Sequence, residues 1–196
     1  ALPEVRQIER VVQAARASFI LPEDVTISIE TTPKIAAQQA EKMRALYEMG
    51  IRRISMGVQT VNPRLLQEVG RSVTSLDYNQ RAVEHIRAAG FKRFNVDVMY
   101  GFAHQALHSV EATLKHVIDL RPEYVTLYRM RYKGTRLVEQ AQHVLLEDVT
   151  AQALLAKQML LAAGYHGTHG KNTFSRLAAD VGTSDYLTER VIHGTP

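Results

Sequence analysis

Residues 49–59 have the sequence Met-Gly-Ile-Arg-Arg-Ile-Ser-Met-Gly-Val-Gln and carry the main signal for the fold. A helical apolar pattern over 36–49 stops at Gly50, and glycine is the residue that most often follows a helix end. Residues 53–59 then alternate between apolar and small or polar side chains, as a strand does. The same order of residue types returns at 89–95, Ala-Gly-Phe-Lys-Arg-Phe-Asn. Each copy predicts a helix that leads directly into a strand.

The same alternation extends outward in both directions along the chain. Thr32 and Pro33 predict the start of the helix that ends at Gly50. Further helices are expected over 3–19, 75–89, 107–120 and 145–163, and further strands over 25–29, 94–99 and 124–129. Residues 165–196 lack periodicity, so we expect loops there with a short helix over 186–193. Helices between short strands predict a parallel sheet, either doubly wound or closed as a barrel.

The two faces of each strand favour the barrel. Side chains alternate across a strand, so Ile54, Met56 and Val58 share a face opposite Ser55, Gly57 and Gln59. Phe94, Val96 and Val98 likewise oppose Asn95 and Asp97. A parallel sheet covered on both sides is apolar on both, because buried polar groups cost free energy unless they are paired. We therefore predict a barrel whose polar strand faces line a lumen that holds a ligand.

Three polar residues fall near the carboxyl ends of successive strands, where β/α barrels build their sites. They are Glu30, Gln59 and Asp97. Any one of them alone could equally cap the turn that follows its strand. Their matching position on three strands favours a binding site on the rim.

The composition excludes several classes of function. The 196 residues have a formal charge of +4 and contain no cysteine, which removes disulfides, thiolate nucleophiles and all-cysteine iron-sulfur sites from what these residues do unaided. The cations are spread along the chain, so no nucleic-acid partner is expected. Neither a membrane span nor a secretory signal is visible, and a cytoplasmic location is the expectation.

Other candidate motifs give weaker signals. Residues 164–172 have the wrong glycine spacing for a phosphate loop. His104 with His108, and His166 with His169, are spaced as metal ligands are, but neither pair has a carboxylate or cysteine partner. We therefore predict no metal site, and leave open that the second pair contacts haem iron or porphyrin carboxylates.

Four sequence motifs resemble those of the radical S-adenosylmethionine enzymes of the oxygen-independent coproporphyrinogen III oxidase family. They are Ile-Ser-Ile-Glu at 27–30, Arg-Ile-Ser-Met-Gly-Val-Gln at 53–59, Gly-Arg at 70–71, and Asn-Val-Asp-Val-Met-Tyr-Gly at 95–101. The resemblance covers about residues 1–133. It implies a partial β/α barrel of the radical S-adenosylmethionine type that lacks its first two β/α units, with residues 134–196 as a helical and loop extension.

The resemblance also implies cofactors and the residues that contact them. Glu30, Gln59, Arg71 and Asp97 match positions that contact S-adenosylmethionine, whereas on sequence alone Arg71 is equally a solvated residue at a helix end. The three cysteines that hold a [4Fe-4S] cluster in the family would lie in the missing first unit, so this chain alone is expected to be inactive. In an intact protein, an electron donor would supply electrons to the cluster.

The implied activity is turnover of a porphyrin or haem-related small molecule through a 5′-deoxyadenosyl radical. The segment Tyr-Arg-Met-Arg-Tyr-Lys-Gly-Thr at 128–135 departs from the coproporphyrinogen oxidases, so the substrate stays open. The alternative is a haem-binding or haem-transfer protein on the same fold without turnover. The tail at 183–196 is more similar to the haem-chaperone and haem-utilisation branches.

Overall fold

A computed structural model describes residues 3–21, 25–71, 75–167, 171–177 and 180. Its strands are β1 (Ile27–Thr31), β2 (Ile51–Gln59), β3 (Arg93–Tyr100), β4 (Tyr124–Arg129), β5 (His166–Gly167) and β6 (Thr173–Ser175). Its helices are α1 (Val5–Ser18), α2 (Pro33–Gln38), α3 (Ala40–Glu48), α4 (Pro63–Glu68), α5 (Leu76–Ala88), α6 (Leu107–Asp119) and α7 (Leu146–Ala162), with a 3-10 helix η1 (Val138–His143). None of these helices has the length and apolar content that a bilayer span requires.

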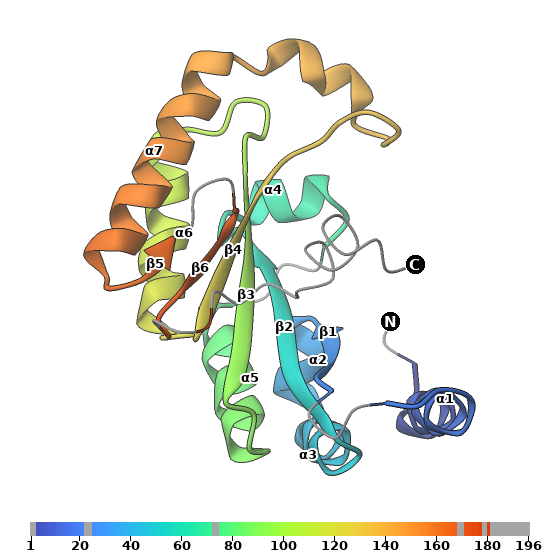
Figure 1. Cartoon of the computed structure of the whole chain (residues 1–196). Coiled ribbons are helices and arrows are strands. Elements are labelled where there is room, and N and C mark those ends of the chain that lie inside the picture. The colour runs from blue at the N-terminus through green and yellow to red at the C-terminus, as the bar shows by residue number, and fades with distance from the viewer. Residues whose placement is uncertain (1–2, 22–24, 72–74, 168–170, 178–179, 181–196) are drawn as a thin grey trace.

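The strands form one sheet in the order β1-β2-β3-β4-β6-β5 (Figure 1). Strands β1 to β4 are parallel to their neighbours, and helices lie between them along the chain. The predicted α/β fold with a sheet of parallel strands is confirmed.

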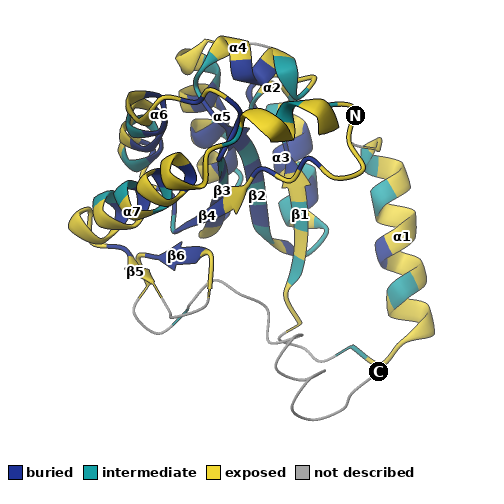
Figure 2. Cartoon of the chain, turned by 90° about the horizontal axis from the view of Figure 1, so that it is seen from above, coloured by how far each residue is buried: buried dark blue, intermediate teal, exposed yellow. Residues whose placement is uncertain are grey.

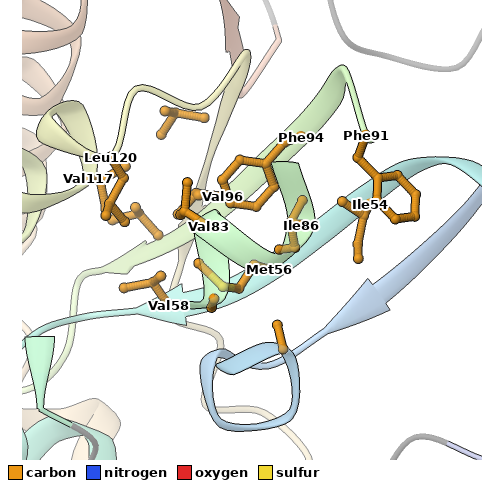
Figure 3. Close-up of a cluster of buried hydrophobic side chains, with 14 of the residues drawn as sticks. Ile54, Met56, Val58, Val83, Ile86, Phe91, Phe94, Val96, Val117 and Leu120 are labelled. Carbon is orange, nitrogen blue, oxygen red and sulfur yellow. The ribbon is translucent and has the colours of Figure 1, made fainter. Parts of the chain in front are cut away.

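Helices cover one side of the sheet, and α1 stands apart beside β1 (Figure 2). The core lies between the sheet and these helices (Figure 3). It contains the apolar faces of β2 and β3, including Ile54, Met56, Phe94 and Val96, packed with helical residues such as Ile86. The prediction that the apolar strand faces point toward the helices is therefore confirmed, and the polar faces are left on the other side.

A second, smaller apolar cluster lies apart from the main core. Its buried members are Leu65, Phe102, Ala103, Met130 and Tyr132, and we call it the rim cluster because its segments follow the carboxyl ends of β2, β3 and β4. It joins α4, the loop after β3 and the chain after β4.

The structure corrects several sequence predictions. The single helix expected over 36–49 is broken at Gln39, whose φ of −128° and ψ of 62° are not helical, so α2 and α3 are separate. The apolar pattern did not predict α4 and η1, which are only six residues each. Such short helices carry too few apolar repeats for a periodic signal.

The sequence predicted loops over 165–175, whereas His166–Gly167 and Thr173–Ser175 form strands. Strand β6 pairs antiparallel with β4, with Thr173 opposite Thr126 and Phe174 opposite Val125, and β5 pairs with β6. Strands this short are defined by their partners rather than by local sequence. The helix expected over 186–193, the tail at 183–196 and His169 lie outside the described residues. The division into 1–133 and 134–196 stays a prediction.

Candidate functional site

One open cavity of about 240 Å³ contains all four predicted cofactor residues. Glu30 comes from β1, Gln59 from the last position of β2, Asp97 from β3, and Arg71 from the turn after α4. The other lining residues are Pro3, Thr31, Thr32, Ile35 and Gly57. The structure therefore brings together four predicted residues that lie up to 67 positions apart in the chain, from Glu30 to Asp97, and three of them come from parallel strands.

Asp97 lies in a network of polar side chains that crosses the strands. Ser55 Oγ donates to Asp97 Oδ2 (2.9 Å), and Asn95 Nδ2 donates to both Asp97 Oδ1 (2.8 Å) and Ser55 Oγ (2.8 Å). Thr126 Oγ1 in turn donates to Asn95 Oδ1 (2.9 Å) and lies 3.1 Å from Thr173 Oγ1. These bonds fix the orientation of the Asp97 carboxyl group at the cavity wall.

The cavity carries charges of both signs. Burial raises the pKa of Asp97, the hydrogen bonds from Ser55 and Asn95 lower it in part, and the nearby Glu30 carboxylate raises it again. The pKa of Tyr128 is also raised, first by burial and then by the charges of Asp97 and Glu30, which places the phenol near both carboxylates. A ligand with a positive group would relieve the repulsion between the two carboxylates.

Gln59 enters the cavity through an irregularity in β2 rather than by simple alternation. The register of β2 against β3 shifts between Gly57 and Gln59, and Gln59 has a φ of +66°. The Gln59 amide folds over Gly57, where a Cβ would lie 2.6 Å from Gln59 Nε2. Glycine at position 57 therefore leaves the space that the amide occupies.

Two buried oxygens of lining residues lack hydrogen-bond partners among the residues that the structure describes. They are Gln59 Oε1 and Thr31 Oγ1, on side chains that are 8% and 5% exposed. Buried polar atoms in native proteins are almost always bonded, to protein or to other molecules. Gln59 therefore fits a site that a polar ligand completes.

Arg71 is exposed, and its guanidinium lies above β2. Arg71 Nη2 is 3.6 Å from the position that a Cβ would take on Gly57. Within the described ranges, neither the Arg71 guanidinium nor the Glu30 carboxylate forms a hydrogen bond or ion pair with another residue. Both charged groups are therefore available to a ligand, and Arg71 is at once a helix-end residue and a cavity residue.

Pro3, Thr31 and Ser55 belong to the site but were not predicted from the sequence. Ser55 was placed on the polar face, but nothing in the sequence indicated its bond to Asp97. Thr31 follows Glu30 on the opposite face of β1 and gave no signal, since its place in the cavity depends on the local path of the strand end. Pro3 comes from a segment distant from the sheet in sequence.

The histidine pairs do not form a metal centre within the part of the chain that the structure describes, where no group of three or more candidate ligands is found. His104 instead stacks against His143, with ring centroids 5.1 Å apart. His166 is exposed on β5. The contact between haem and the second pair stays untested.

The chain is an α/β protein with a parallel sheet and a cavity lined by charged side chains near the carboxyl ends of its strands. Residues 2–117 match the family model of the Radical SAM superfamily, and this chain belongs to that superfamily. The superfamily implies S-adenosylmethionine and a [4Fe-4S] cluster as cofactors. With no cysteine, these residues do not fit the cluster.

Curated relatives agree with the resemblance seen in the sequence. The chain is 34% identical over 111 residues to the oxygen-independent coproporphyrinogen III oxidase of Paracoccus denitrificans, covering 57% of this chain and 24% of the relative. It is 28% identical over 145 residues to the heme chaperone HemW of Haemophilus influenzae, covering 73% and 37%. The predicted relationship to both branches is confirmed.

The solved structure of the coproporphyrinogen III oxidase HemN from Escherichia coli matches with a TM-score of 0.80 at 24% identity. The match covers 94% of this chain and 43% of that chain, and it supports the fold assignment. The chain spans less than half the length of each of these three proteins.

Proposed function

We propose that this chain forms the S-adenosylmethionine-binding part of a radical S-adenosylmethionine protein that acts on a porphyrin or haem-related small molecule. The observation that carries the proposal is the convergence of Glu30, Gln59, Arg71 and Asp97 on one cavity. The names of the relatives, a coproporphyrinogen oxidase and a heme chaperone, support the substrate class.

Each residue has a role that suits its chemistry. The Arg71 guanidinium binds the carboxylate of the cofactor, because its planar donors match a carboxylate. The Glu30 and Asp97 carboxylates accept hydrogen bonds from the ammonium group or the ribose hydroxyls. The unpaired Gln59 Oε1 accepts a further hydrogen bond once the amide turns toward the ligand.

These residues orient the cofactor and do not act as acid-base catalysts. When bound, S-adenosylmethionine supplies on one-electron reduction the radical that abstracts hydrogen from the substrate. Ser55 and Asn95 hold the Asp97 carboxyl group, so the ligand meets an acceptor that is already oriented. The strand ends shield the bound ligand from water on the sheet side.

Isothermal titration calorimetry of the whole chain with S-adenosylmethionine tests the proposal. We expect binding in the wild type and a loss of about tenfold or more in affinity for Glu30→Ala and for Asp97→Ala, since each removes a charged acceptor. Asp119→Ala, an exposed carboxylate at the end of α6, is the control. Unchanged affinity in both cavity variants, with folding intact by circular dichroism, would reject the assignment.

The second candidate is a haem-binding or haem-transfer protein without turnover. The similarity to HemW supports it, since this match covers 73% of the chain at 28% identity. Anaerobic incubation of a form that carries cluster cysteines, with S-adenosylmethionine, an electron donor and either coproporphyrinogen III or haem, separates the two. A modified tetrapyrrole product supports the enzyme, whereas stoichiometric haem uptake without product supports the carrier.

A further inference from the structure

Arg71 reaches the cavity from the end of a short helix rather than from a strand. Helix α4 ends in two hydrogen bonds, from Gly70 N to Gln67 O (3.0 Å) and from Arg71 N to Leu66 O (2.9 Å). Gly70 has a φ of +71°, the left-handed conformation that this type of helix ending requires. The position of the Arg71 guanidinium therefore depends on how firmly the carboxyl end of α4 is held.

A residue from the chain after β4 holds that end of α4. Arg136 Nη2 donates to the backbone oxygen of Glu68 (2.8 Å), one of the last-turn carbonyls that a helix leaves without an internal partner. The same nitrogen lies 3.1 Å from the position that a Cβ would take on Gly70. A cation is also favoured at the negative end of the helix dipole. Arg136 thus contacts both the last residue of α4 and the glycine that precedes Arg71.

The segment that carries Arg136 is anchored by contacts of its own. In the rim cluster, Met130 and Tyr132 are buried together with Leu65 of α4, and Leu137 packs against them. Tyr132 Oη also accepts a hydrogen bond from Ala103 N (2.6 Å). Removing the Arg136 side chain would therefore release the turn without detaching the segment.

We propose that Arg136 is a positioning residue for cofactor binding that acts through the turn at Gly70 and holds Arg71 above β2. The proposal rests on the proposed function, because it takes Arg71 as the partner of the cofactor carboxylate. It gives the chain after β4 a part in cofactor binding, although Arg136 does not line the cavity. The three links are the bond to Glu68, the approach to Gly70 and the lining position of Arg71.

Calorimetry on the whole chain with two nucleosides tests this role. S-adenosylhomocysteine carries the amino-acid carboxylate, and 5′-methylthioadenosine lacks it. We expect Arg136→Ala to weaken S-adenosylhomocysteine binding about fivefold or more, and to change 5′-methylthioadenosine binding less than about twofold. Lys133→Ala removes an exposed charge from the same segment and is the matched control, with both affinities unchanged.

A double-mutant cycle and amide exchange complete the test. In an Arg71→Ala background, Arg136→Ala should cause no further loss of affinity, because Arg136 acts on the ligand only through the Arg71 side chain. Without any ligand, hydrogen exchange at the Arg71 amide should be faster in Arg136→Ala than in Lys133→Ala, because its bond to Leu66 O lies in the released turn.

The outcomes separate the two proposals. If the wild type binds neither nucleoside, the proposed function is overturned and the role of Arg136 with it. If the wild type binds S-adenosylhomocysteine and Arg71→Ala weakens that binding, three results overturn the Arg136 proposal alone. They are unchanged affinity in Arg136→Ala, equal weakening for both nucleosides, and losses from the two variants that add.

Discussion

Asp97 shows how neighbouring strands set the properties of a single residue. Its position on β3 follows from side-chain alternation, but its hydrogen bonds come from Ser55 on β2 and from Asn95 on its own strand. Burial is the largest effect on its pKa, which lies above the ordinary value of 3.8. The site thus holds the carboxyl group in place, but burial makes its ionised form less favourable than in water.

This cost predicts a pH-dependent effect of Asp97→Asn. A carboxyl group with a higher pKa in the folded than in the unfolded chain binds more protons when folded, so the stability falls as the pH rises between the two values. We expect the variant to have a higher Tm than the wild type at pH 7, because it has no charge to bury. The difference should vanish below the unfolded value of 3.8, where the wild type is also neutral.

Thermal unfolding of both proteins at neutral and acid pH measures the effect. A lower Tm for Asp97→Asn at pH 7 would contradict it, since the ionised carboxylate would then stabilise the fold. The same variant should bind S-adenosylmethionine more weakly. A gain in stability together with a loss of affinity would show that the Asp97 carboxylate serves binding at the expense of stability.

Helix α4 shows how an element too short to be stable alone delivers a site residue. Pro63 occupies its first turn, and Asn62 Oδ1 accepts hydrogen bonds from Arg64 N (3.0 Å) and Leu65 N (3.3 Å). Isolated helices of this length are not stable in water, so capping and packing decide whether it forms. The cap at its amino end and Arg136 at its carboxyl end therefore hold α4, and Arg71 lies in the turn that follows the end held by Arg136.

Asn62→Ala should destabilise the protein by about 1 kcal/mol, the usual cost of losing a side-chain cap. Urea unfolding measures the change in the free energy of unfolding. Gln67→Ala, an exposed change in the same helix, should have little effect. An equal loss in both variants would mean that the cap does not hold α4.

The polar network links four strands of the sheet, β2, β3, β4 and β6. It runs from Asp97 and Ser55 through Asn95 to Thr126, and Thr126 contacts Thr173 of β6. At the amino end of β4, Tyr124 Oη donates to Asp180 (2.5 Å), which also pairs with Arg93 (3.2 Å). Contacts between distant parts of the chain thus support the strand faces that line the site.

Asn95→Ala tests the network at this scale. Asn95 is 3% exposed, and its loss leaves Thr126 and Asp97 short of partners in a buried site. We expect a loss of about 2–4 kcal/mol in the free energy of unfolding by urea titration. Thr126→Ser keeps the hydroxyl donor, so its free energy of unfolding should fall much less. A loss in Asn95→Ala below about 1 kcal/mol would mean that the network contributes little.

Three features could be predicted from the sequence: the alternation of helices and strands, the apolar and polar faces of each strand, and the rim positions of Glu30 and Asp97. Strand period and helix caps are local properties, so they can be recognised without coordinates. The resemblance of the sequence motifs also predicted that Gln59 and Arg71 contact the cofactor.

The way in which Gln59 and Arg71 reach the cavity depends on contacts between distant parts of the chain. Gln59 does so by a register shift at Gly57, and Arg71 by a turn that Arg136 holds from 65 positions further along the chain. Strand β6 likewise forms because β4 offers an edge to pair with. Contacts between residues far apart in sequence depend on how the elements pack against one another, and a local pattern of residue types does not contain that information.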